Sequence, residues 1–176
     1  WLGLFLKGAL HYIPHLNRTV NYNLLSEEVS SGFCIIEDKN DHVWYGGPSG
    51  LFLIDKKKIN ARPEKVSPLR VFNLVQFNDS ILWAGTRKGS MFQINTRTLK
   101  VTSLPILPHT DLYVTYIYPD SHQRIWIGTD NNGLYVSDRN GSIIAFYSKE
   151  QLGSNAIKGI IEDEMSNIWV GTGNGL

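Results

Sequence analysis

The chain has 176 residues, which is enough for one domain with a sizeable hydrophobic core. Its 17 lysines and arginines balance 16 aspartates and glutamates, which argues against a dedicated nucleic-acid binder because such proteins carry a concentrated basic excess. The single cysteine, Cys34, excludes an intramolecular disulfide and a Cys-based zinc site, and no apolar run approaches the roughly 20 residues needed to span a bilayer.

An internal repeat organises the whole chain. All tryptophans occupy the same slot of this repeat, at Trp1, Trp44, Trp83, Trp126 and Trp169, with spacings of 43, 39, 43 and 43 residues. Each is followed two residues later by glycine, at Gly3, Gly46, Gly85, Gly128 and Gly171. No tryptophan occurs elsewhere in the chain, so the arrangement is not explained by chance.

The unit at 112–156 shows the expected strands most clearly. They are Tyr113–Tyr118, Ile125–Gly128, Leu134–Ser137 and Ile143–Tyr147. The turn at 138–141 contains Asn and Gly, which tolerate the positive φ of tight hairpins. A longer loop at 148–156 is expected to lead into the next unit. No helical period of convincing length occurs, and 26–31 could form one short turn at most.

Four short antiparallel strands in each unit of about 40–45 residues are typical of a β-propeller blade. The sequence therefore predicts an all-β fold, a β-propeller of four-stranded antiparallel blades. Tryptophan in the second strand is expected to pack between neighbouring blades, and the glycine after it to leave room for the adjoining blade. An aspartate six residues before the tryptophan is expected to cap its own turn, at Asp38, Asp120 and Asp163.

The phase of the repeat predicts an incomplete arc of a larger ring. We expect a partial blade at 1–31, complete blades at 32–68, 69–111 and 112–156, and a partial blade at 157–176, all in one propeller domain. A closed ring of four blades is disfavoured because the blade completed by the two chain ends would contain the tryptophan strand twice.

The candidate ligand-binding residues lie in loops that break the repeat. The loop after the tryptophan strand and the loop joining successive blades emerge on one face of a propeller, and such loops often carry function. The residues selected there are Arg87, Lys88, Asp130, Asn131 and Asn132. Planar Arg and Asn side chains suit sugar hydroxyls or an acidic glycan. Ordinary solvated loop tips are the alternative interpretation.

Catalytic chemistry is not indicated by the sequence. The carboxylate pairs at 37–38 and 162–164 recur in one slot of their units, so turn capping explains them better than glycosidase chemistry. The five histidines lack the spacing of metal ligands. We therefore expect no catalytic residue, no metal and no cofactor, and a protein that binds and relays.

Three segments carry a resemblance to a known family. The segments IIEDKNDHVWYGGPSGLFLID, IYPDSHQRIWIGTDNNGLYVSD and IIEDEMSNIWVGTGNGL resemble the two-component regulator propeller repeat. That repeat runs Ile-x-x-Asp, a short turn, Ile-Trp-hydrophobic-Gly-Thr, then Gly-Leu. The resemblance extends over essentially the whole chain and is looser around Trp1 and Trp83.

The resemblance implies an extracytoplasmic, ligand-sensing propeller of seven blades in a hybrid two-component regulator. It implies a periplasmic location, an oligosaccharide ligand derived from glycans, and a homodimeric full-length protein. It also implies a membrane helix, a histidine kinase and a DNA-binding regulator elsewhere in that protein, with no nucleic-acid contact in this segment. Two alternatives stay open. One is a propeller enzyme resembling streptogramin lyases, which use a metal and a histidine on the ring face, where only His109 qualifies. The other is a protein-interaction scaffold.

Overall fold

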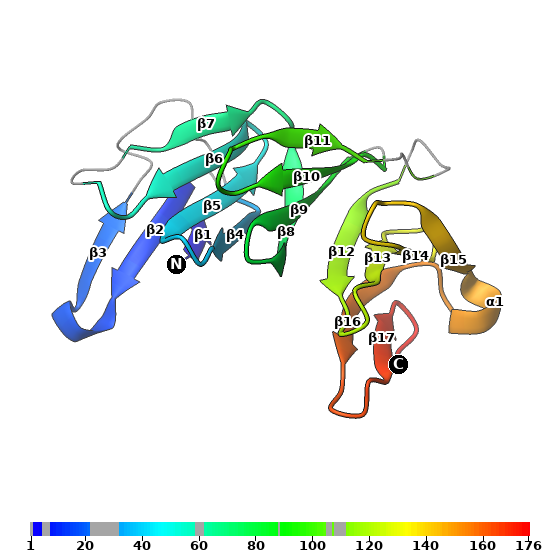
Figure 1. Ribbon diagram of the computed structural model, residues 1–176. Coiled ribbons are helices and arrows are strands. Elements are labelled where there is room, and N and C mark those ends of the chain that lie inside the picture. The colour runs from blue at the N-terminus through cyan, green and yellow to red at the C-terminus, as the bar shows by residue number, and fades with distance from the viewer. Residues whose placement is uncertain are drawn as a thin grey trace.

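The computed structural model describes residues 2–4, 8–21, 32–58, 62–87, 89–104, 107 and 112–176. Its strands form successive antiparallel sheets, each built from consecutive stretches of chain (Figure 1). The first sheet contains β1 (Leu2–Leu4), β2 (Gly8–Ile13) and β3 (Arg18–Asn21), with the 3-10 turn η1 (Pro14–Leu16) between the last two. The last contains β16 (Ile157–Glu162) and β17 (Ile168–Thr172).

Three four-stranded sheets lie between these two. One contains β4 (Cys34–Glu37), β5 (His42–Gly47), β6 (Gly50–Asp55) and β7 (Glu64–Ser67). The next contains β8 (Val71–Asn78), β9 (Ile81–Thr86), β10 (Met91–Asn95) and β11 (Val101–Ser103). The third contains β12 (Val114–Pro119), β13 (Ile125–Thr129), β14 (Leu134–Ser137) and β15 (Ile143–Tyr147).

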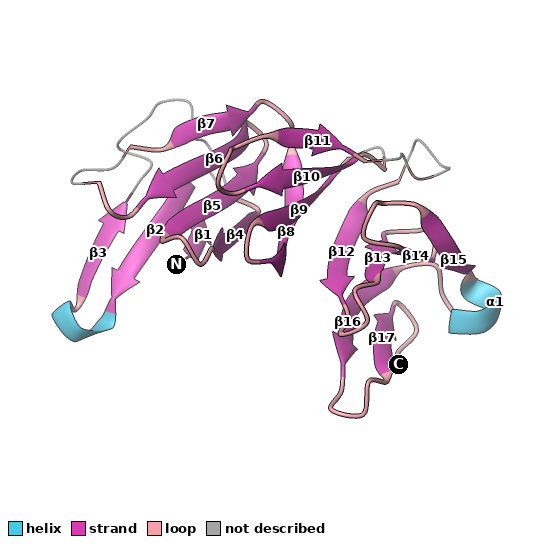
Figure 2. Cartoon of the chain, in the orientation of Figure 1, coloured by secondary structure: helices cyan, strands magenta, loops and turns pink. Residues whose placement is uncertain are grey.

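The sheets follow one another around an open arc. The first strands of consecutive sheets are in contact, β4 with β8, β8 with β12, and β12 with β16. The first and last sheets lie at opposite ends of the arc and do not close into a ring (Figures 1 and 2). The predicted all-β architecture of four-stranded blades in an incomplete propeller is therefore confirmed.

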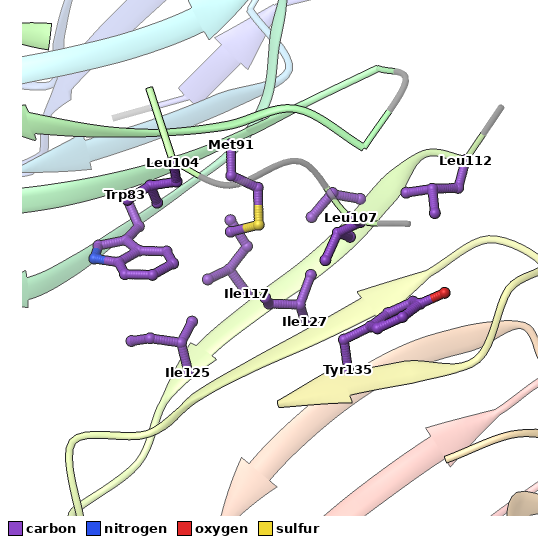
Figure 3. Close-up of a cluster of buried hydrophobic side chains, with 10 residues drawn as sticks. Trp83, Met91, Leu104, Leu107, Leu112, Ile117, Ile125, Ile127 and Tyr135 are labelled. Carbon is purple, nitrogen blue, oxygen red and sulfur yellow. The ribbon is translucent and has the colours of Figure 1, made fainter. Parts of the chain in front are cut away.

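Three of the tryptophans pack between neighbouring sheets, as predicted. They are Trp44, Trp83 and Trp126, and all are buried. Trp83 lies in a cluster with Ile117 and Ile125 of the following sheet (Figure 3). Trp169 of the last sheet is 51% exposed, because no described residue covers that face. Trp1 lies outside the described residues.

The glycine after each buried tryptophan receives a β-branched side chain from the next sheet. A Cβ on Gly128 would lie 2.6 Å from Cγ2 of Ile157, and one on Gly85 would lie 2.7 Å from Cγ1 of Val114. Gly46 has the same relation to Val71, at 2.7 Å. Since real Cβ atoms do not approach so closely, the absence of a side chain allows the blades to meet, as predicted.

The aspartate before the tryptophan strand caps its turn and also binds the tryptophan. Asp38 accepts hydrogen bonds from the backbone N–H groups of Asn40, at 2.7 Å, and His42, at 3.1 Å. Its second oxygen accepts the indole N–H of Trp44 at 2.8 Å. Capping was predicted from the sequence, whereas the indole bond was not. The turn before Trp83 lacks this aspartate, and the buried indole nitrogen there has no hydrogen-bond partner among the described residues.

One expected loop contains a short helix. Within 148–156, α1 (Lys149–Leu152) forms because Ser148 and Gln151 make a capping box at its start. The left-handed Gly153 ends the helix after one turn. The helix is too short for a hydrophobic period, so sequence periodicity could not reveal it. The turn considered at 26–31 lies outside the described residues.

Candidate functional site

The loops that follow the tryptophan strands are hydrogen-bonded to the loops that join the blades. The N–H of Gly89 donates to the carbonyl of Leu112 at 3.1 Å, and the N–H of Gly133 donates to the carbonyl of Asn155 at 2.9 Å. Two sets of loops far apart in the sequence therefore share one face of the arc, which we call the loop face. This common face is where the repeat pattern placed the candidate ligand-binding residues.

A threonine closes the loop that contains Asn131 and Asn132. The hydroxyl of Thr129 donates to the carbonyl of Gly133 at 2.8 Å and accepts the N–H of Asn132 at 2.9 Å. Asn131 is exposed at the loop tip. Neither asparagine lines the two pockets described below.

Asp130 and Arg87 meet at the same aromatic residue. Asp130 and Tyr113 exchange two hydrogen bonds, in which each backbone N–H donates to an oxygen of the other residue at 3.1 Å. The Arg87 guanidinium lies over the ring of Tyr113, 4.5 Å from its centroid. Tyr113 thus joins a loop of the β8–β11 sheet to a loop of the β12–β15 sheet.

A row of aromatic side chains, the aromatic row, crosses the loop face. It consists of Phe33, Phe72 and Tyr113, which come from three consecutive blades. Phe33 stacks on Phe72 with centroids 4.9 Å apart and planes within 14°. Phe72 meets Tyr113 edge to face at 6.1 Å. Phe33 remains 41% exposed, so part of this apolar surface is open to solvent.

A pocket along this row has a volume of about 380 Å³. It is lined by Phe72, Tyr113, Val114, Thr115 and Asp130. An open pocket with an aromatic wall and one carboxylate can bind a ring that has an apolar face and polar substituents. We call it the aromatic pocket.

A second, smaller pocket lies on the other side of Arg87. It has a volume of about 220 Å³ and is lined by Leu69, Arg70, Thr86, Arg87, Ser90 and Phe92. Because Arg87 lines this pocket and covers Tyr113 of the aromatic pocket, the two pockets are adjacent. We call it the arginine pocket.

The structure extends the set of site residues beyond those selected from the sequence. Of that set, it brings together Arg87 and Asp130, while Lys88 lies outside the described residues, as does His109. The aromatic row was missed. The sequence did contain a signal for this row, an aromatic residue near the start of the first strand of each complete blade. These residues are the central ones in GFC (32–34), VFN (71–73) and LYV (112–114), and the repeat pattern does not require them.

The paired carboxylates occupy the turns on the opposite side of the blades. Asp163 caps its turn and accepts the Trp169 indole N–H at 2.9 Å. Glu162 accepts the backbone N–H of Ser121, from the preceding sheet, at 2.8 Å. These contacts match the structural interpretation of the pairs. Within the described part of the chain, no group of three or more His, Cys, Asp or Glu side chains could hold a metal.

One stretch of the repeat matches a known family of propeller repeats. Residues 109–131 match the family model described as a two component regulator propeller. This match confirms the resemblance that was predicted from the sequence, and it covers the unit around Trp126. A curated relative is the histidine kinase P4 of Formosa agariphila, which is 29% identical in an alignment of 136 residues. The match covers 69% of this chain and 10% of that protein. The chain thus spans a small part of this relative.

Solved structures share the fold. The extracellular domain of the putative one-component system BT4673 from B. thetaiotaomicron superposes with a TM-score of 0.79 at 22% identity, covering 95% of this chain and 24% of that chain. The extracellular domain of the putative hybrid two-component system BT3049 from the same organism gives a TM-score of 0.59 at 18% identity, covering 94% of this chain and 21% of that chain. Among the described residues, no helix has the length and apolar character needed to cross a membrane.

Proposed function

We propose that this chain is part of the extracytoplasmic sensor of a hybrid two-component regulator, located in the periplasm, and that its loop face binds an oligosaccharide. The match of residues 109–131 to the regulator propeller family carries the proposal. Tyr113, Thr115 and Asp130 of the aromatic pocket lie inside the matched segment. The similarity to a histidine kinase and to extracellular domains supports the same assignment.

The pocket suits an oligosaccharide for chemical reasons. A sugar ring has an apolar face of C–H groups that packs against aromatic side chains, and hydroxyls at its edge that need hydrogen-bond partners. The aromatic row supplies the first kind of surface. Thr115 and Asp130 supply polar groups at its border.

Signal relay requires that the ligand favour one arrangement of the protein over another. The aromatic pocket is built from two adjacent blades, with Phe72 on β8 and Thr115 on β12. A ligand in this pocket would therefore hold these blades at one relative position. In the full-length protein, which we propose to be a homodimer, this preference would be transmitted to the kinase. It would then change the rate at which the kinase phosphorylates itself.

The test is binding and kinase activity of the full-length protein with a panel of oligosaccharides. Tyr113→Ala removes the residue shared by both loops and the aromatic row, and should weaken oligosaccharide binding about tenfold or more while lowering ligand-dependent autophosphorylation. Phe146→Ala is the matched control, because Phe146 is 46% exposed on the outer strand β15. Absence of binding to every oligosaccharide would contradict the proposal. Metal-dependent cleavage of a ligand would indicate a lyase, and capture of a protein partner without oligosaccharide binding would indicate a scaffold.

A further inference from the structure

Two arginines line the arginine pocket without acidic partners. Arg70 and Arg87 are both exposed, and both border the same depression of about 220 Å³. Within the described part of the chain, neither forms an ion pair. Some other cations are neutralised, since Lys39, Lys56 and Arg124 are paired with carboxylates. An unneutralised pair of guanidinium groups at a pocket is a favourable place for an anion.

The position of Arg87 is restrained by its aromatic neighbour. Its guanidinium lies 4.5 Å from the centroid of the Tyr113 ring. This stacking holds one face of the planar group and leaves its N–H edge available for hydrogen bonds. A long side chain that is already ordered loses less conformational entropy when it binds a ligand. Arg87 should therefore bind an anion more strongly than a surface arginine whose side chain is not restrained.

The charge distribution orients a ligand across the two pockets. Asp130 lines the aromatic pocket, where its carboxylate would repel a negative group. Among the described residues that line the arginine pocket, none is acidic and two are cationic. An acidic sugar would therefore place its ring and hydroxyls in the aromatic pocket and its negative group between Arg70 and Arg87.

We infer that the two pockets form one site for an oligosaccharide that bears a carboxylate or a sulfate group. A carboxylate presents two oxygens in one plane, and a sulfate ester presents three terminal oxygens around a tetrahedral sulfur. In both groups a pair of oxygens can accept two hydrogen bonds from one guanidinium fork. This inference rests on the proposed function, because it specifies the ligand class of the same site. It adds that negative charge on the sugar is required for strong binding.

A matched series of ligands tests the inference with the full-length protein. Galactotriose, trigalacturonate and sulfated galactotriose differ in having no charge, carboxylates or sulfates on similar sugar rings. At least one charged ligand should bind about tenfold more tightly than galactotriose, and this preference should shrink as salt concentration rises. The charged ligand that binds more tightly distinguishes carboxylate from sulfate recognition.

Variants of the two arginines then test whether the preference for a charged ligand arises in the arginine pocket. Arg70→Gln and Arg87→Gln should each remove most of the advantage of the charged ligand and leave galactotriose affinity within about threefold. Arg97→Gln is the control, because Arg97 is exposed in the hairpin after β10, away from both pockets. Equal binding of charged and neutral ligands, or a preference unchanged in both variants, would overturn the charge inference alone. Failure of all three ligands and of the wider panel would overturn the proposed function with it.

Discussion

At the scale of single residues, the aspartate six positions before the tryptophan is a buried charge held by several donors. The side chain of Asp120 is 0% exposed and accepts the indole N–H of Trp126 at 2.9 Å. It also accepts the backbone N–H of Arg124 at 2.8 Å and the Nε–H of the same residue at 2.6 Å. Burial alone would raise the pKa of Asp120, but these hydrogen bonds keep its pKa below the ordinary value. The spacing between Asp and Trp in the repeat thus has a chemical cause.

Replacing this carboxylate should destabilise the blade. Asp120→Ala leaves the indole N–H and the turn amides without their acceptor, and we expect a loss of about 2–4 kcal/mol in the free energy of unfolding. Denaturant unfolding monitored by tryptophan fluorescence measures it. Asp79→Ala is the control, because its side chain is 67% exposed and pairs with an exposed lysine, and it should cost less than about 1 kcal/mol. Equal effects of the two variants would contradict the buried role of Asp120.

The aspartate in the same position of the last blade, Asp163, should make the free energy of unfolding depend on pH in acid. Hydrogen bonds from Trp169 and then from Asn167 lower the pKa of Asp163 to about 2. Because this folded-state pKa lies below the unfolded value of about 3.9, the contribution is fully present above that value and is lost as pH falls towards about 2. Unfolding midpoints measured between about pH 5 and pH 2 should fall more steeply for the unaltered protein than for Asp163→Asn. Parallel curves would show that Asp163 does not contribute.

At the scale of elements, adjacent sheets are joined by a branched side chain that fills the space above a glycine. Ile157 on β16 approaches Gly128 on β13, and Val114 on β12 approaches Gly85 on β9. The tryptophan on the same strand packs beside this contact. Each contact between neighbouring blades, which we call a joint, therefore depends on a tryptophan and on a glycine two positions after it.

Adding one methyl group should disturb such a joint. Gly128→Ala places a Cβ 2.6 Å from Cγ2 of Ile157, and the resulting displacement should cost about 1–3 kcal/mol in the free energy of unfolding. The double variant with Ile157→Ala is the control, because it removes the colliding methyl group. Its destabilisation should be smaller than the sum of the two single effects. Strict additivity would show that the two residues do not meet in solution.

The sequence predicted those features that depend on the repeat and missed those that depend on one loop meeting another. The tryptophan slot, the glycine after it and the aspartate turn are local and periodic, so their roles could be inferred before the structure. The aromatic row could not, because Phe33 and Phe72 are 39 residues apart and meet only when two blades are placed side by side. Arg87 and Asp130 were selected as loop residues, but their common contact with Tyr113 required the fold.

At the scale of the whole molecule, each sheet is held mainly by its neighbours along the arc. Contacts run from one blade to the next, so a change at one joint alters the relation of only two blades directly. The aromatic pocket lies at such a joint, between the sheets that contain β8 and β12. Within each of the three four-stranded sheets the second strand is almost wholly buried, whereas the outer strand is largely exposed.

This gradient predicts the pattern of amide hydrogen exchange. Amides in the second strands β5, β9 and β13 should exchange slowest, and those in the outer strands β7, β11 and β15 should exchange faster by about tenfold or more. Peptide-resolved exchange followed by mass spectrometry measures the difference. Uniform protection across a sheet would contradict the burial gradient.

An oligosaccharide that binds as proposed should also change the exchange pattern. It should slow exchange at 70–73 and 112–115, on both sides of the joint, because residues of these segments line the pockets. It should leave exchange in β15 unchanged, because no residue of β15 lines either pocket.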